Sequence, residues 1–250
     1  MNNDNRYVTK YQNDMNLVPL KDFNAIEIDL FFAICTKMKD KGTRKVRYDF
    51  HDLKSLSNYH VNNAQERFIN DLEHVYKKMQ TLRYTKTENK RREYFILFPH
   101  FVIDENEKYV EISLNKDLEH ILNNLTGNFT RFELKELTNI KTSYAKNMFR
   151  LLKQFRGTGL FKISIEDFRE RLDIPKSYQM SDIDKRVLKY IERDLSESFS
   201  NLKIEKVKKG RKVVGLEFTF NKEDHKQKKK KEIEVIEQLT QEKSKEMWGF

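Results

Sequence analysis

The two halves of the chain are expected to repeat one order of secondary-structure elements, and this repeat limits the possible folds more than any other feature. Each half reads as a helix, a short strand, a short helix, a longer helix and a hairpin. In the first half we expect these elements at residues 24–38, 46–50, 51–58, 62–82 and 84–98, with a further strand at 109–113. In the second half, a short helix after residue 130 precedes elements at 142–155, 160–163, 164–172, 181–199 and 202–220.

Short polar signals mark where several of these helices begin. Asn24 with Glu27, and Thr130 with Glu133, have the spacing of a capping box, in which each side chain satisfies the other residue's backbone N–H. Ser181 is expected to cap the long helix of the second half. These signals support the helical part of the repeated order.

The repeated order is that of the winged helix, a helix-turn-helix followed by a β-hairpin wing. We therefore predict an α+β, helix-rich fold of two tandem winged-helix domains. The predicted divisions are a flexible N-terminal arm at 1–16, a first domain at 17–125, a second domain at 126–222 and a charged tail at 223–250. A chain of 250 residues can accommodate two such domains, each with its own core.

Composition and missing motifs argue against several other classes. Only 7 Gly and 3 Pro are present, too few for a glycine-rich nucleotide fold or a typical β-sandwich. The single cysteine, Cys35, forms no internal disulfide, and no stretch approaches the roughly 18 apolar residues of a membrane span. We expect a cytoplasmic protein without membrane contact.

No motif for catalysis or cofactor binding is present. The chain lacks the phosphate-binding glycine-lysine loop of ATPases. Its six histidines form no His-x-His pair and no close spacing with Cys35, which argues against metal-dependent nicking of DNA. We therefore expect a binding protein rather than an enzyme, with no cofactor and no metal.

The net charge of +10 is concentrated in one part of the chain. Residues 141–212 carry 19 Lys and Arg against 10 Asp and Glu, whereas residues 1–125 carry 20 against 19. A solvated surface alone does not require such an uneven distribution. A basic surplus confined to one predicted domain points to a polyanion partner, and double-stranded DNA suits a helix-turn-helix.

The long helix at 181–199 is the predicted recognition helix. At helical spacing, Ile183, Val187, Ile191 and Leu195 share one face, while the cations lie on the other. Contact with DNA phosphates offsets the electrostatic repulsion among such cations. An Arg side chain can also recognise guanine through two hydrogen bonds. The DNA-binding candidates on this helix are Lys185, Arg186, Lys189, Tyr190 and Arg193.

The predicted wing and two further segments complete the candidate interface. Gly210 supplies the wing turn, and the cations around it suit contact with the DNA backbone or minor groove: Lys206, Lys208, Lys209, Arg211 and Lys212. The helix at 142–155 adds Ser143, Lys146 and Arg150, and its N-terminus is expected to face a phosphate. In the first half, the hairpin turn adds Lys90, Arg91 and Arg92.

The long helix of the first half, at 62–82, has a different surface. Its outer positions mix acidic, basic and neutral side chains, so this face suits a protein partner better than a DNA groove. We expect the second domain to read DNA and the first to pair with protein or to assist at the backbone. Two folded domains without any such division remain the alternative.

Several segments of the second half form specific motifs: FTRFEL (129–134), SYAKNMFRLLKQFRGTG (143–159), FKISIEDFRERL (161–172), Tyr178, DKRVL (184–188) and KKGRKV (208–213). In the first half, NLVPL (16–20) and NAIEIDLFFAICTK (24–37) form less specific ones. Together these segments, which cover roughly residues 16–222, resemble the iteron-binding plasmid replication initiators.

This resemblance implies a protein that binds direct repeats at a plasmid origin, helps to open the adjacent duplex and recruits the host initiator DnaA and the replicative helicase. It also implies that monomers act on the repeats while dimers repress, and that the first domain supports dimerisation. From the residues alone, a two-domain winged-helix transcription regulator remains the alternative.

Overall fold

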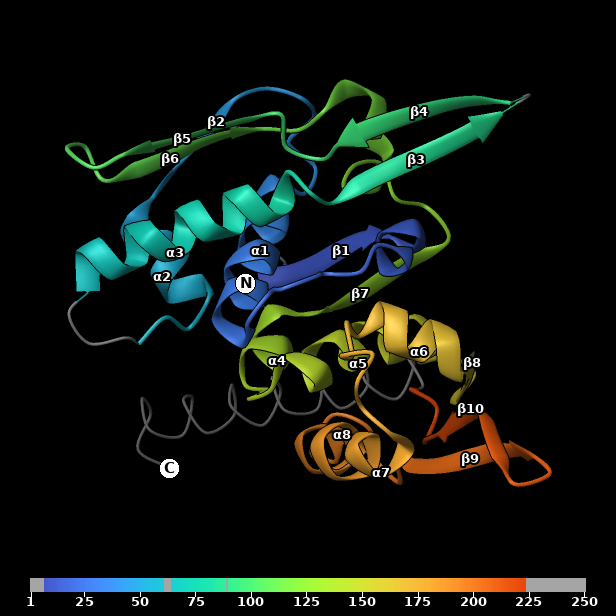
Figure 1. The fold of residues 1–250 in the computed structure, drawn as a ribbon. Coiled ribbons are helices and arrows are strands. Elements are labelled where there is room, and N and C mark those ends of the chain that lie inside the picture. Colours follow the sequence, from blue (N-terminus) through green and yellow to red (C-terminus); the bar gives the residue numbers. More distant parts are fainter. Residues whose placement is uncertain (1–6, 61–63, 89, 224–250) are drawn as a thin grey trace, which may run out of the picture.

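The structure is a computed structural model and describes residues 7–60, 64–88 and 90–223 (Figure 1). The elements of the first half are β1 (Val8–Gln12), η2 (Asn13–Leu17), α1 (Ala25–Met38), β2 (Val46–Asp49), α2 (Phe50–Leu56), α3 (Ala64–Met79), β3 (Arg83–Glu88), β4 (Arg91–Ile96), β5 (His100–Asp104), β6 (Tyr109–Ser113) and η3 (Lys116–Ile121). Helices α2 and α3 with the hairpin β3–β4 confirm the predicted order of helix, longer helix and wing.

The second half repeats this arrangement. Its elements are β7 (Phe129–Glu133), α4 (Leu134–Thr138), α5 (Ser143–Gln154), β8 (Leu160–Ser164), α6 (Ile165–Arg171), α7 (Met180–Ile183), η4 (Asp184–Leu188), α8 (Lys189–Leu195), β9 (Lys203–Lys209) and β10 (Lys212–Thr219). The fold is therefore α+β, with small antiparallel sheets packed against helices. Among the described helices, none combines the length and apolar character that crossing a bilayer requires.

Each half has a small sheet beside its helices. In the first half the strand order is β2-β6-β5, and the hairpin β3–β4 stands apart from that sheet. In the second half the order is β8-β10-β9, so the wing hairpin is part of the sheet. Figure 1 shows both hairpins, β3–β4 and β9–β10, reaching toward the same side of the molecule.

A two-stranded ribbon joins the start of the chain to the second half. Strand β1 pairs antiparallel with β7, with Val8 opposite Glu133 and Gln12 opposite Phe129. Its inward side chains, Thr9 and Tyr11, are fully buried. In Figure 1 the ribbon lies between the layer that contains α3 and the layer that contains α8.

Three sequence expectations are corrected here. The flexible arm predicted at 1–16 is wrong for residues 8–16, which form β1 and most of η2, and residues 1–6 lie outside the described residues. Thr130 caps no helix because it belongs to β7, and the capping box before α4 consists of Glu133 and Glu136. The long helix begins earlier than predicted, since Gln179 rather than Ser181 occupies the N-cap.

The predicted tail at 223–250 also has one residue inside the described part. The backbone N–H of Glu223 donates to the carbonyl of Arg156 at 2.9 Å, so this residue is bound to the folded second half rather than belonging to the tail. Residues 224–250 lie outside the described residues. The domain boundaries near 125 and 222 stay predictions.

Aromatic side chains run through one core that both halves share. Ring centroids of Tyr11 and Phe32 lie 5.7 Å apart, those of Phe32 and Phe132 5.9 Å, and those of Phe132 and Phe149 5.1 Å. The series continues to Phe199, 5.8 Å from Phe149, and to Phe220, 4.9 Å from Phe199. Packing of this kind holds the two halves as one body.

Gly159 is expected to be the least replaceable glycine of the second half. Its φ is +68°, and an added Cβ would lie 2.4 Å from the carbonyl oxygen of Phe220. The substitution Gly159→Ala should therefore lower the free energy of unfolding by about 2–4 kcal/mol, because it combines a left-handed backbone with backbone overlap.

The matched control is Gly157→Ala, where an added Cβ meets nothing within 4 Å. Urea unfolding of both variants checks the prediction, and equal stabilities would contradict it.

Candidate nucleic-acid interface

The reading helix, defined as the continuous segment α7–η4–α8 at residues 180–195, has the two faces that its sequence predicts. Its apolar side is buried in the core, through Ile183, Val187, Leu188, Ile191 and Leu195. The opposite side exposes all five predicted DNA-binding side chains, Lys185, Arg186, Lys189, Tyr190 and Arg193. This face runs along α7, η4 and α8, whose residue ranges follow one another without a break.

The middle of this helix departs from α geometry. Residues Asp184–Leu188 form a π-helical turn, and the backbone N–H of Lys189 reaches the carbonyl of Asp184, five residues back. Single π turns inside α-helices are frequent at functional sites, because the extra residue changes the direction of the side chains that follow. Here the turn contains Lys185 and Arg186 and comes immediately before Lys189.

Arg186 is held in place by a ring from a neighbouring loop. Its guanidinium carbon lies 5.2 Å from the ring centroid of Tyr178, and Nε lies 3.9 Å from Asp182. A hydrogen bond with Tyr178 and the nearby charges raise the pKa of Arg186. An Arg stacked in this way keeps its planar edge available for a base or a phosphate.

The substitution Tyr178→Ala should weaken specific DNA binding by about 0.5–1 kcal/mol, because it removes the ring that orders Arg186. Tyr178→Phe should retain most of the affinity, since it keeps the ring and loses only the hydroxyl. Titration of labelled cognate DNA with the three proteins checks this, and equal affinities for Ala and wild type would contradict it.

Arg193 is ordered in a similar way at the end of the helix. It lies 4.7 Å from the ring centroid of Tyr190 and pairs with Asp194 at 2.7 Å. Burial would raise the pKa of Asp194, but hydrogen bonds from Arg193 and Thr142 outweigh it and hold the pKa below its ordinary value. The exposed basic face is therefore anchored to α5 through Asp194.

The wing places its cations beside the reading helix. Gly210 turns the hairpin with φ of +62°, and Lys208, Lys209, Arg211 and Lys212 are all exposed around it. Lys206 is also exposed, but its Nζ lies 2.7 Å from Asp184. This contact ties the wing to the first turns of the reading helix, so Lys206 both carries charge and positions the wing.

Two predicted DNA contacts on α5 are wrong in this arrangement. Lys146 is 1% exposed and Arg150 is 0% exposed, because α5 is covered on this side by the first half of the chain. The N-terminus of α5, predicted to face a phosphate, receives a carboxylate instead: Thr142 donates from its backbone N–H and its hydroxyl to Asp194. Ser143 lies half-buried beside it, and its contact with DNA stays a prediction.

The first half provides a smaller basic patch. Lys90, Arg91 and Arg92 are exposed at the turn of the β3–β4 hairpin, and Arg91 pairs with Glu93. Lys90 adopts a left-handed conformation with φ of +67°. On α3, Lys77 pairs with Glu73 and Arg67 approaches Asp71, so much of this face is neutralised internally.

Sequence reasoning missed two residues that organise the interface. Tyr178 and Asp184 belong to the motifs that resemble the initiators, but the sequence alone assigns neither of them a contact. Their contacts with Arg186 and Lys206 connect separate elements. Helical periodicity carries no signal for such contacts.

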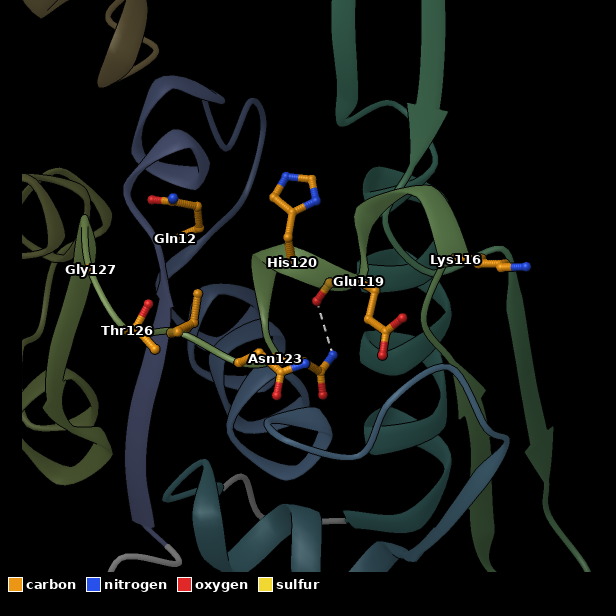
Figure 2. Close-up of a pocket in the computed structure, with 9 residues that line it drawn as sticks. Gln12, Lys116, Glu119, His120, Asn123, Thr126 and Gly127 are labelled. Atoms are coloured by element: carbon orange, nitrogen blue, oxygen red, sulfur yellow. Dashed lines mark hydrogen bonds between the residues drawn. The ribbon is translucent and has the colours of Figure 1, made fainter.

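A shallow polar hollow of about 450 Å³ lies away from these residues (Figure 2). It is lined by Gln12 of β1, by Lys116, Glu119 and His120 of η3, and by residues 123–127. In the part of the chain that the structure describes, no group of three His, Cys, Asp or Glu side chains is placed to hold a metal.

Comparisons with known proteins agree with this geometry. A probable replication protein of Bifidobacterium longum (strain NCC 2705) is 32% identical over 218 residues, covering 86% of this chain and 73% of that protein. Among solved structures, the Pi initiator protein in complex with iteron DNA has a TM-score of 0.65 at 14% identity, covering 88% of this chain and 99% of that one. That likeness shows a common fold.

Two family descriptions match nearly the whole described chain. Residues 8–153 match the first winged-helix domain (WH1) of the initiator replication proteins, and residues 164–220 match the second (WH2). The chain therefore belongs to the initiator replication protein family, whose members contain two winged-helix domains.

Proposed function

We propose that this chain is a plasmid replication initiator that binds repeated double-stranded DNA sites, or iterons, at an origin. The observation that carries the proposal is the exposed basic face of α7, η4 and α8 beside the cationic wing β9–β10. An α-helix fits the major groove of B-DNA, and a wing can follow the adjacent backbone. The Pi initiator, which shares the fold, is described in complex with iteron DNA.

Within this proposal the two domains have different tasks. The second reads bases through Arg186, Lys189 and Arg193, and its wing contacts phosphates through Lys208, Lys209, Arg211 and Lys212. The first contacts the backbone through Lys90, Arg91 and Arg92 and pairs with a second copy of the chain. No catalytic residue, cofactor or metal is assigned.

The finer steps follow from the resemblance. Bound monomers assist opening of the duplex beside the repeats and recruit the host initiator DnaA and the replicative helicase. Dimers repress initiation or transcription of their own gene. These steps use protein surfaces outside the reading helix, so variants in that helix test DNA recognition separately.

The proposal is tested by replication in trans. A replicon that carries the origin but lacks this gene should fail to replicate, and supply of the wild-type chain should restore it. The variant R186A/K189A should not restore replication, although it is expressed and folded. A replicon that persists without the gene, with altered transcription only, would instead identify a transcription regulator.

A further inference from the structure

The two halves of the chain are joined by charged side chains that are buried. Lys146 of α5 places Nζ 2.6 Å from Oδ1 of Asp29 on α1 and 2.8 Å from the carbonyl of Leu137. Lys146 is 1% exposed and Asp29 is 8% exposed. The ion pair therefore joins α1 to α5 across 117 residues of sequence and is shielded from water.

Arg150, one turn further along α5, makes a second connection. Its guanidinium donates to the carbonyls of Met15 and Val18, both at 3.0 Å, and to the side chain of Asn147 at 3.1 Å. The fork geometry of Arg fixes the direction of each donor. These bonds set the position of the segment that leads from η2 toward α1.

A network of neutral side chains lies beside Arg150. The hydroxyl of Tyr11 donates to Asn16, and the amide of Asn16 donates to Thr130 and Gln154 at 2.9 and 3.0 Å. In the described residues, every buried side-chain nitrogen or oxygen has a hydrogen-bond partner. A fully satisfied polar network of this kind selects one arrangement of its elements.

The buried ion pair is not explained by stability alone. Burial raises the pKa of Asp29 to about 7 and lowers the pKa of Lys146, so both charged forms lose solvation in the folded chain. Replacing a buried ion pair by apolar side chains is often neutral or stabilising. Apolar side chains would not supply the directional hydrogen bonds that Lys146 makes.

The same elements connect the two candidate DNA-binding units. In the first half, α1 packs against α3, and Glu27 of α1 pairs with Lys78 of α3 at 2.7 Å. In the second half, α5 packs against α8, and Thr142 holds Asp194 beside Arg193. Helix α1 also packs against α5, and Figure 1 shows the β1–β7 ribbon and α5 lying between α3 and α8.

We infer that Asp29, Lys146 and Arg150 are positioning residues that fix the distance and angle between the two winged helices. The chain then accepts only DNA in which the stretches contacted by each half have one spacing and one helical phase. This inference rests on the proposed function, and it adds that the spacing within each site is set by a buried contact between the halves.

The wild-type chain itself provides the first test. One to five base pairs are inserted at successive positions across the protected DNA site, and each affinity is measured. Five base pairs rotate one part of the site by about half a turn relative to the other. Insertion between the two contacted stretches should lower the affinity at least tenfold, whereas insertion outside them should leave it unchanged.

The second test replaces the positioning pair by apolar side chains of similar size, D29L/K146M. This variant should bind the native site more weakly and should lose the spacing dependence, with the ratio between native and inserted sites falling below threefold. Affinity for a shortened site that contains only the stretch contacted by the second half should stay unchanged. A simple loss of folding would lower that affinity as well.

The matched control is the partly exposed pair Lys37–Asp52, which joins α1 to α2 within the first half at 2.7 Å. The variant K37M/D52L should keep the wild-type ratio. If D29L/K146M does not fold, D29N/K146Q serves in its place, because it keeps polar groups while removing both charges.

The outcomes separate the two proposals. If the wild-type chain prefers cognate over scrambled DNA but tolerates every insertion, or if the positioning variant keeps the wild-type ratio, the positioning role is wrong and the proposed function stands. If the wild-type chain shows no preference for cognate DNA, the proposed function itself fails.

Discussion

The double substitution R186A/K189A should weaken binding to the cognate repeat by about 2–6 kcal/mol, because each lost base contact costs about 1–3 kcal/mol. Both side chains are exposed on the reading helix, so folding should be unaffected. Affinity for scrambled DNA should fall much less, since only the general charge changes there. Titrations on cognate and scrambled DNA at one salt concentration measure both effects.

A wing substitution provides the contrast. Lys208→Ala should weaken cognate and scrambled DNA alike and should lower the slope of log affinity against log salt by about one. Lys162→Ala, on the outer strand β8 and paired with Glu217, should leave both affinities nearly unchanged. If R186A/K189A reduces the two affinities equally, the reading helix does not recognise bases.

The substitution Arg150→Ala should lower the free energy of unfolding by about 3–5 kcal/mol, the usual cost of removing one partner of a buried charged contact. The carbonyls of Met15 and Val18 would lose their donor, and a cavity would form where the side chain is now fully buried. Chemical unfolding followed by circular dichroism provides the measurement.

Arg67→Ala is the control for this effect. Arg67 also lies on a helix, but its side chain is 62% exposed and its nearest carboxylate, on Asp71, is 4.0 Å away. It should change the free energy of unfolding by less than about 0.5 kcal/mol. A loss below 1 kcal/mol for Arg150→Ala would show that the buried contact between the halves does not hold them together.

The reading helix could be predicted because all its DNA-binding candidates lie on one face of a single helix. The separation of Ile183 and Val187 from Lys185 and Lys189 follows from periodicity, and the structure keeps it. The wing was predictable for a similar reason, since Gly210 between two alternating strands indicates a hairpin.

The same reasoning gave a wrong prediction for the second basic face, on α5. Periodicity shows that Lys146 and Arg150 lie opposite one apolar stripe, but it does not show that another part of the chain covers them. Their partners, Asp29 and the carbonyls of Met15 and Val18, lie more than 110 residues earlier. Helical spacing in a single sequence therefore does not distinguish a buried cation from a cation that binds DNA.

The N-terminal strand was missed because its pairing is distant. β1 has five residues, and its partner β7 lies about 120 residues later, so no local turn signals the pair. Thr130 then looked like a helix cap, although it faces inward from β7 and donates to Asn13. Long-range strand pairing depends on the whole fold rather than on neighbouring residues.

The most direct test of the central claim is a footprint of the purified chain on DNA from its own replicon, with scrambled DNA as the control, at about 150 mM salt. The account predicts protection at regular intervals near one or two helical turns, and no protection of the scrambled DNA. A single palindromic footprint, or equal protection of both DNAs, would contradict it.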